Sequence, residues 1–270
     1  MTRFLVTNDD GIFSEGIKLL ASALATLGEV FVVAPDREQS ASGHALTLSR
    51  PLRMQKVEEN WYAVDGTPTD CVNLGVLSLL KDRPPDLVCS GINFGLNVGD
   101  DVTYSGTVSA TFEGTLLGIR SLAFSQEVVE GFSFARAAAF ARALVETVLA
   151  APDLPRDLLL NVNIPAGEIQ GVSFTRLGRR VYKQSVVEKV DPRGRKYYWI
   201  AGTPQWQKDS GTDHEAVSSG HVSVTPLHLD LTYYRGLELF SGLQEKLSRI
   251  DLCSLCSDDK SPRPPRRGEE

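Results

Sequence analysis

The 270-residue sequence contains little cysteine and no long apolar run. Of its four cysteines, Cys71 and Cys89 each stand alone in an apolar segment, and Cys253 and Cys256 lie near the end of the chain. That distribution is typical of a reducing cytoplasm and not of a disulfide framework. The sequence also lacks the roughly 18 consecutive apolar residues of a membrane-spanning helix, and its first residues do not resemble a signal peptide. We therefore expect a cytoplasmic protein without membrane contact.

Basic residues are not in excess either. The chain has 28 Lys and Arg against 34 Asp and Glu, a formal charge of -6. This balance argues against a protein that holds a nucleic acid duplex through a broad basic surface. A single phosphate, in contrast, can be held by a metal ion, backbone amides and a helix N-terminus. The net charge therefore leaves a small phosphorylated substrate open.

Several sequence motifs of known enzyme classes are missing. Without Gly-x-Ser-x-Gly, His-Glu-x-x-His or Asp-x-Asp-x-Thr, the chain does not fit the serine hydrolases, the zincins or the haloacid-dehalogenase-like phosphatases. The absence of Gly-x-Gly-x-x-Gly argues against an NAD-dependent oxidoreductase, and the P-loop signature is also absent. Cys253-x-x-Cys256 has no second ligand pair, which argues against a structural zinc site.

The first 170 residues alternate short β-type runs with helical periodicity. Strands are predicted at 4–7, 30–34, 86–90, 122–124 and 158–164, with extra short strands at 45–48, 52–57 and 61–64. Helices are predicted at 16–27, 67–80, 106–118 and 132–150. This order indicates an α/β fold with a doubly wound, mostly parallel sheet that carries helices on both faces.

The sequence pattern changes from residue 171 onward. Strands are predicted at 172–177, 181–187, 196–200 and 222–226, which together indicate a β-rich arm. An amphipathic helix at 237–250 then has a small apolar face, and we expect it to pack on another chain or back on the sheet. Residues 257–270 contain three prolines and balanced charges without a large apolar side chain, which predicts disorder.

Polar loops follow the predicted strands, where open parallel sheets bind their ligands. After the first strand, Asp9 and Asp10 are adjacent carboxylates that fit a divalent metal site, or else one of them forms an Asx turn that caps the next helix. After the second strand, Ser40 or Ser42 offers a hydroxyl to the same place, although each is also a common turn residue. His44 is expected to be a hydrogen-bonded structural residue.

The most informative segment runs from residue 90 to 108. Three glycines allow close approach of the backbone to a ligand, and Asn93 and Asn97 offer carbonyl oxygens to a metal and amide donors to an anion. Ser105, Gly106 and Thr107 open a helix whose N-terminus favours phosphate. We therefore predict phosphate binding by Asn97, Ser105, Gly106 and Thr107.

Taken together, these loops resemble the SurE family of stationary-phase survival proteins, which are metal-dependent nucleoside monophosphate phosphatases. The resemblance extends over about residues 3–250. In the first half it is carried by Thr7-Asn8-Asp9-Asp10-Gly11, Ala34-Pro35-Asp36-Arg37 with Ser40, Gly66-Thr67-Pro68-Thr69-Asp70-Cys71, Ser90-Gly91-Ile92-Asn93 and Tyr104-Ser105-Gly106-Thr107-Val108. In the second half it is carried by Asn161-Val162-Asn163-Ile164-Pro165, Asp191-Pro192-Arg193-Gly194, Gly211-Thr212-Asp213 and the segment from His221 to Leu227.

The resemblance implies a metal site and an architecture. The family's ligands correspond to Asp9, Asp10, Ser40 and Asn93, which would hold one divalent cation per subunit, Mg²⁺ or Mn²⁺. The implied fold is a Rossmann-like core with a protruding β-hairpin arm and a C-terminal segment that is exchanged in a homodimer or homotetramer. We expect a SurE-like phosphatase domain over 1–252, with its core at about 1–170 and the arm and C-terminal segment at about 171–252, followed by a disordered tail at 253–270.

The implied activity is that of a 5′-nucleotidase, which hydrolyses nucleoside monophosphates to nucleoside and phosphate. Hydrolysis of 3′-nucleotides and of short polyphosphate stays open. Asp9 and Asp10 are the expected catalytic residues, with Asp9 assigned to proton transfer on position alone, while a side-chain nucleophile stays an alternative. Leu96 and His221 depart from the family pattern and bear on substrate preference. The competing interpretation is a nucleotide or anion sensor that uses the same loops without chemistry.

Overall fold

The structure is a computed structural model that describes residues 1–183, 186–200, 203–207 and 209–248. Contacts within the chain divide it into a compact unit from Met1 to Leu229 and a second unit that begins at Asp230. The first unit carries all of the predicted site residues. Across the described residues, no helix combines the length and the apolar character needed to cross a membrane.

A nine-stranded, mostly parallel sheet forms the centre of the first unit, as predicted. Its strand order is β3-β4-β2-β1-β5-β6-β7-β13-β8. The six strands from β4 to β7 in this order are parallel neighbours, whereas β3 and β13 pair antiparallel with β4 and β7. The bounds are β1 Arg3–Thr7, β2 Glu29–Pro35, β3 Met54–Glu58, β4 Trp61–Val64, β5 Leu87–Phe94, β6 Arg120–Gln126, β7 Leu159–Ile164, β8 Gly171–Phe174 and β13 His221–Pro226.

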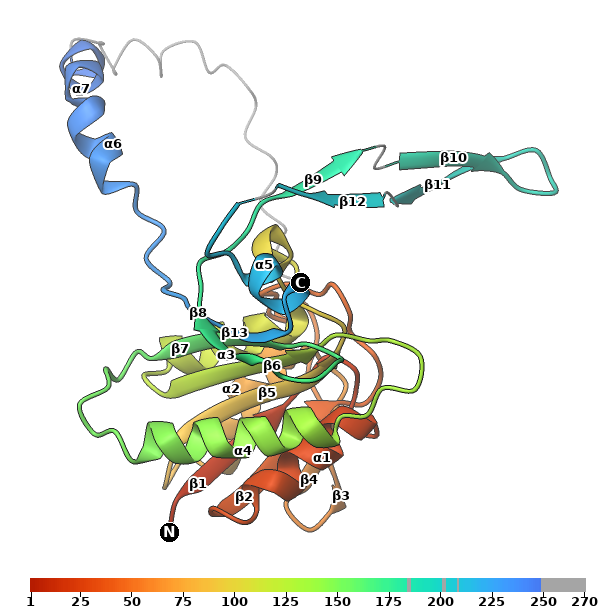
Figure 1. The fold of residues 1–270 in the computed structure, drawn as a ribbon, viewed down its shortest axis with the longest axis vertical. Coiled ribbons are helices and arrows are strands. Elements are labelled where there is room, and N and C mark those ends of the chain that lie inside the picture. The colour runs from red at the N-terminus through yellow and green to blue at the C-terminus, as the bar shows by residue number, and fades with distance from the viewer. Residues whose placement is uncertain (184–185, 201–202, 208, 249–270) are drawn as a thin grey trace, which may run out of the picture. The chain divides into compact units, whose positions relative to one another are not determined.

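Helices cover both faces of this sheet (Figure 1). α1 (Glu15–Leu24) and α4 (Ala135–Leu149) lie on one face, and α2 (Pro68–Leu74) and α3 (Gly106–Leu116) lie on the other. Side chains along a strand alternate between faces, so Phe4 and Val6 join the hydrophobic cluster under α1 and α4, while Leu5 joins the cluster under α2. The helices therefore bury the apolar strands of the sheet on both sides.

The order of strands reverses beside β1. From β1 the chain adds β2 on one side, and it later adds β5 on the other, with Thr7 of β1 opposite Ser90 of β5. Loops that leave the carboxyl ends of two such strands diverge and leave room for a ligand. The fold therefore places the loop after β1 and the glycine-rich segment after β5 next to each other.

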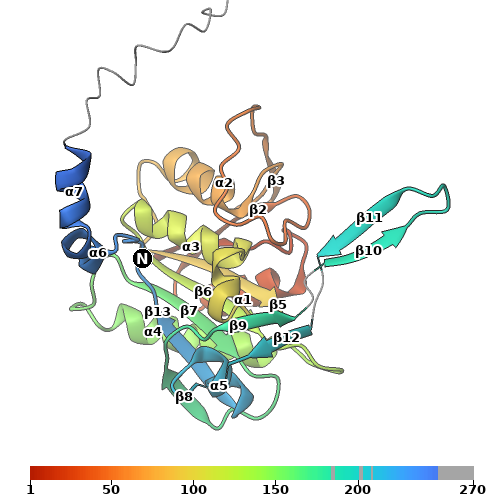
Figure 2. The same ribbon diagram turned by 90° about the horizontal axis from the view of Figure 1, so that it is seen from above.

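The arm consists of two antiparallel strand pairs outside the main sheet (Figure 2). β9 (Arg180–Lys183) pairs with β12 (Thr203–Trp206), and β10 (Val186–Val190) pairs with β11 (Lys196–Ile200). Every residue of β10 and β11 is exposed. A short helix, α5 (Asp213–Ser218), follows β12 and precedes β13.

Several predicted boundaries were wrong. Residues 45–48, all within the described part of the chain, form no strand, and the predicted strand 181–187 is divided between β9 and β10. The helix predicted at 67–80 ends at Leu74 and continues as a π-helical turn over Gly75–Leu79. β5 runs four residues further than predicted, because its pairing with β6 resumes after an irregularity between Ser90 and Asn93.

The second unit contains two short helices. α6 (Tyr234–Leu239) and α7 (Ser241–Leu247) replace the single helix predicted at 237–250, whose last two residues lie outside the described part. Its large apolar side chains are exposed, among them Leu237, Phe240 and Leu243. The tail predicted to be disordered at 253–270 also lies outside the described residues.

Candidate active site

The loop after β1 positions both aspartates at the carboxyl end of the sheet. The Asn8 side chain donates to the Gly11 carbonyl at 2.9 Å and to the Ser14 hydroxyl at 2.8 Å, which folds the loop back on itself. Gly11 has a φ of +94°, a conformation that favours glycine. The N-cap residue of α1 is Ser14. The aspartates therefore lie ahead of the helix, and the structure decides against the helix-cap interpretation.

Asp9 is almost completely buried, with 4% of its surface exposed. Its carboxylate accepts a hydrogen bond from the Thr107 hydroxyl and further hydrogen bonds from the backbone at Thr107 and Gly106. Burial raises the pKa of Asp9 above its usual value, and these hydrogen bonds oppose the rise. A Cβ atom at Gly106 would lie only 2.8 Å from the Asp9 Cβ. The start of α3 therefore packs directly on the Asp9 side chain.

Asp10 lies next to Asp9 and is half-buried. Its Oδ2 accepts a hydrogen bond from the Phe94 backbone at 3.2 Å, which connects the loop after β1 to the end of β5. Burial, the negative charge of Asp9 and that of Glu38 raise the pKa of Asp10 to about 6. Among the described residues, no basic side chain forms an ion pair with either aspartate.

The loop after β2, which carries Ser40 and Ser42, lies against the loop of this pair. The Gln39 backbone donates to the Asp9 carbonyl at 2.7 Å, which brings the loop after β2 against the loop after β1. Ser40 is exposed, and its hydroxyl donates to Glu38 at 2.7 Å. The buried hydroxyl of Ser42 has no hydrogen-bond partner among the described residues. It and the Asp9 carboxylate both pack against Gly106, where an added Cβ would lie 2.8 Å from the Ser42 hydroxyl and 2.9 Å from Asp9 Oδ2. Ser42 therefore lies beside Asp9, whereas the role of Ser40 as a metal ligand stays a prediction.

Asn93 lies near the end of β5, and it is half-buried. Its amide nitrogen donates to the Gly95 carbonyl at 2.9 Å, so its carbonyl oxygen is the atom left for a metal ion. Carboxylate, amide and hydroxyl oxygens are the donors that Mg²⁺ and Mn²⁺ prefer. Within the described residues, no group of three or more His, Cys, Asp or Glu side chains could hold a metal.

This donor set fits a hard divalent cation. Two adjacent carboxylates, one buried and one half-buried, have raised pKa values and lack a countercharge in the described chain. A charge removed from water without a partner is unfavourable. A divalent cation would supply that charge and would accept the oxygen atoms of Asp9, Asp10 and Asn93. The residues present therefore agree with the metal that the sequence predicts.

Of the predicted phosphate-binding residues, Gly106 and Thr107 lie beside Asp9, and most polar groups of the set already have protein partners. The Ser105 hydroxyl caps α3 by accepting from the Val108 backbone at 3.1 Å, and the Thr107 hydroxyl donates to Asp9. Asn97 is buried, and its amide nitrogen donates to the Ser125 hydroxyl at 2.9 Å. The role of these residues in phosphate binding stays a prediction.

Two asparagines that the sequence analysis treated only as a family match hold Asn97 in place. The main-chain carbonyl of Asn97 accepts hydrogen bonds from the side chains of Asn161 at 2.8 Å and Asn163 at 3.0 Å. The main-chain N–H of Asn97 donates to the Asn163 side chain at 2.8 Å. Both asparagines project from β7, where every residue is buried. The sequence did hold a signal for this role, since two asparagines alternate within an otherwise apolar strand. A buried side-chain amide requires hydrogen-bond partners, so such asparagines are expected to bind other polar groups.

Asp213 is a second residue whose role sequence analysis missed. It is buried at the start of α5, and it accepts from the backbone of Gly99 at 2.7 Å and of Gly178 at 2.8 Å. Burial raises the pKa of Asp213, against the effect of these hydrogen bonds. Its carboxylate therefore ties the glycine-rich segment to the chain that leads into the arm.

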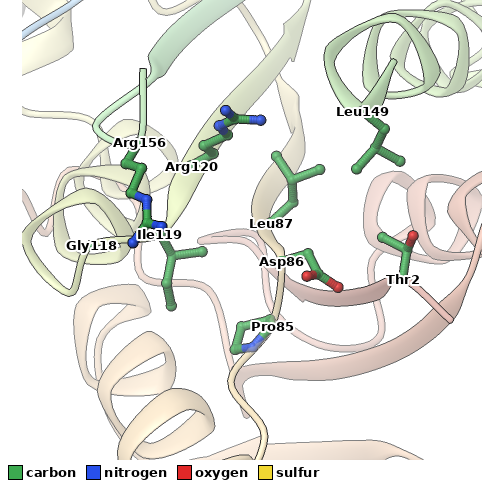
Figure 3. Close-up of a pocket in the computed structure, with 9 residues that line it drawn as sticks. All are labelled: Thr2, Pro85, Asp86, Leu87, Gly118, Ile119, Arg120, Leu149 and Arg156. Carbon is green, nitrogen blue, oxygen red and sulfur yellow. The ribbon is translucent and has the colours of Figure 1, made fainter. Parts of the chain in front are cut away.

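Two cavities among the described residues lie away from this site. One of about 390 Å³ is lined by residues at the amino ends of the strands, including Thr2, Asp86 and Arg120 (Figure 3). It is at the opposite edge of the sheet from the aspartates. A second, of about 560 Å³, lies beside α5 and is lined by Trp206 and His214, whose rings stack at 4.2 Å.

Comparisons with known proteins show which family the chain resembles. A family model described as "Survival protein SurE" matches residues 4–184. The "5′-nucleotidase SurE" of Geotalea daltonii is 56% identical over 87% of this chain and 96% of its own, and that of Myxococcus xanthus is 54% identical over 90% and 93%. The crystal structure of the SurE protein from Aquifex aeolicus is 49% identical, with a TM-score of 0.81 over 90% of this chain and 99% of that one.

Proposed function

The chain belongs to the SurE family, and on that premise we propose that it is a metal-dependent phosphomonoesterase that hydrolyses nucleoside monophosphates to nucleoside and phosphate. The observation that carries the proposal is a pair of adjacent carboxylates, Asp9 buried and Asp10 half-buried, at the strand-order switch point without a basic partner among the described residues. The relatives named as 5′-nucleotidases cover nearly the whole domain. Nucleoside 5′-monophosphates are the first substrates to test, followed by 3′-nucleotides and short polyphosphate.

In this proposal Asp9, Asp10, Ser40 and Asn93 hold one divalent cation, Mg²⁺ or Mn²⁺. When bound, the cation offsets the negative charge of the phosphate and orients it. The positive end of the α3 dipole favours the same phosphate, while the backbone amides of Gly106 and Thr107 hold the Asp9 carboxylate. Asn97 is held rigidly by β7, so it can orient a phosphate oxygen without prior reorganisation. We assign proton transfer to Asp9 on position.

The test is phosphate release from a panel of 5′- and 3′-nucleotides, with EDTA and with Mg²⁺ or Mn²⁺ restored. Asp9→Asn is compared with Asp157→Asn, which changes an exposed aspartate outside the site, and metal content is measured for both variants. We expect release that requires the metal and is lost only in Asp9→Asn. Nucleotide binding without release under any condition would instead identify a sensor.

The proposal extends to assembly and location. We infer one SurE-like domain over 1–252 that forms a homodimer or homotetramer, in which partner subunits cover the exposed apolar side chains of α6 and α7. Molar mass from light scattering tests this, and Phe240→Asp is expected to weaken the assembly. A cytoplasmic location is consistent with the free, buried thiols of Cys71 and Cys89.

A further inference from the structure

The loop that carries Ser40 has little to hold it in place. Residues 36–53 contain neither helix nor strand, and none of these described residues is buried. Leu46 and Leu48, its first large apolar side chains, are 49% and 87% exposed. A segment without buried apolar side chains is held by its polar contacts. The position of Ser40 relative to the metal site therefore depends on which residues the polar groups of the loop bind.

Several polar contacts join residues 39–47 of this loop to the rest of the described chain. The Gln39 backbone donates to the Asp9 carbonyl, and the Gly43 backbone donates to the Tyr104 carbonyl at 3.1 Å. Thr47 donates to Asp70 from its backbone at 2.9 Å and from its hydroxyl at 2.6 Å. The Ala45 carbonyl accepts from the Thr67 hydroxyl at 2.7 Å, and the His44 side chain contacts Glu113 on α3.

The contact between His44 and Glu113 is reinforced by a second hydrogen bond to the same carboxylate. His44 Nε2 lies 2.8 Å from Glu113 Oε2, and Asn73 of α2 donates to the other carboxylate oxygen at 2.9 Å. The side chain of Glu113 is only 10% exposed, and the ring of His44 packs edge-on against Phe112 with centroids 5.9 Å apart. Hydrogen bonds from His44 and Asn73 hold the pKa of Glu113 below its usual value. The carboxylate therefore stays charged and requires its partners.

The same face of α3 also holds the metal site. Glu113 follows Gly106 by seven residues, which is about two helical turns, so the two residues lie on one face. Gly106 packs against Asp9 and Ser42, and Glu113 binds His44. One rigid helix therefore sets the position of Asp9 and, through His44, the position of the loop that bears Ser40.

We propose that His44 and Glu113 are positioning residues of the metal site, which hold the Ser40 loop at the distance from Asp9 that a divalent cation requires. This inference rests on the proposed function, because it presumes a metal bound by Asp9 and Ser40. Residues that support metal ligands from behind typically contribute about 10- to 100-fold to metal affinity. His44 reaches Glu113 and not the reacting groups, so its effect passes through the loop.

The direct test is Mn²⁺ affinity by calorimetry. His44→Ala and Glu113→Gln are expected to weaken Mn²⁺ binding by about 10-fold or more. His44→Gln places an amide donor near the former Nε2, so it should restore most of the affinity. The control is Glu29→Gln, which removes a half-buried ion pair with Arg3 (3.0 Å) at the amino ends of β1 and β2. Glu29→Gln is expected to bind Mn²⁺ as the wild type does.

A double-mutant cycle separates positioning from general destabilisation. If His44 acts through Ser40, then Ser40→Ala with His44→Ala binds Mn²⁺ about as weakly as Ser40→Ala alone, because effects on one coupled contact do not add. Equal Mn²⁺ affinity of His44→Ala and wild type would overturn the inference, as would fully additive losses in the double variant. A wild type that binds no Mn²⁺ would instead overturn the proposed function itself.

Discussion

Replacement of Gly106 by alanine tests whether the start of α3 positions Asp9. The new Cβ would lie 2.8 Å from the Asp9 Cβ, 2.8 Å from the Ser42 hydroxyl and 2.9 Å from Asp9 Oδ2. Separations below about 3.0 Å force the neighbours to move, and here the neighbours are the predicted metal ligand and the second serine. The change therefore displaces the Asp9 carboxylate or lifts the end of α3 away from it.

The magnitude follows from two opposing effects. Overpacking in a buried region destabilises by about 1–3 kcal/mol, while alanine gains up to about 1 kcal/mol over glycine in a helix. We expect a net loss of about 1–2 kcal/mol, which lowers Tm by about 2–4 °C per kcal/mol in a domain of this size. Displacement of a metal ligand should cost far more in function, with Mn²⁺ affinity reduced by about 10-fold or more.

The matched control lies on the same helix. A Cβ at Gly114 would lie 2.4 Å from the Ser121 hydroxyl and 2.9 Å from Val88 Cγ2, a comparable overlap at the other end of α3. Urea denaturation and Mn²⁺ titration of both variants should show similar losses of stability, but a loss of metal affinity only in Gly106→Ala. If Gly106→Ala keeps wild-type Mn²⁺ affinity, α3 does not position Asp9 as argued here.

Three further predictions concern the cation, a buried charge and pH. A Mn²⁺ concentration about 100 times its Kd should stabilise the folded protein by about 2.7 kcal/mol, and a thermal melt should show this rise reversed by EDTA and absent in Asp9→Asn. Asp213→Ala leaves two buried backbone donors without their acceptor, so urea denaturation should show a loss of about 1–3 kcal/mol. The pKa of Glu113 is lower in the folded protein than in the unfolded chain, so its contribution to stability is present above the unfolded value and disappears as pH falls through the folded one. In thermal melts between about pH 6 and about pH 3, a range that spans the ordinary carboxyl pKa, Tm should therefore fall more steeply for wild type than for Glu113→Gln. Parallel curves would contradict this assignment.

Strand and helix order was predictable from local patterns, but several ends were not. Buried strands such as β1 and β7 are continuous apolar or alternating runs, which the sequence displays directly. The extension of β5 to Phe94 depends on pairing with β6, a contact that no local pattern contains. Residues 45–48 alternate like a strand, yet their polar groups bind α2 and its cap, through Thr47 to Asp70 and through Ala45 to Thr67.

The candidate site was predictable to a different degree for different residues. Asp9 and Asp10 attract attention in any sequence, because two adjacent carboxylates after a buried strand require an explanation. The roles of Asn163, Asp213 and Glu113 were not visible, because each acts on a partner more than 30 residues away in the chain. Such residues become interpretable only once the fold shows which distant backbone or side-chain groups they bind.

The sequence alone determined the alternation of strands and helices, the placement of polar residues at strand ends and the likeness to the SurE family. These properties are local, since periodicity and motif spacing are set by neighbours along the chain. Tertiary structure decided that Asp9 does not cap α1, that the start of α3 packs on it, and that His44 reaches Glu113. Those outcomes depend on side chains far apart in sequence, whose burial and hydrogen bonds exist only when the sheet has assembled.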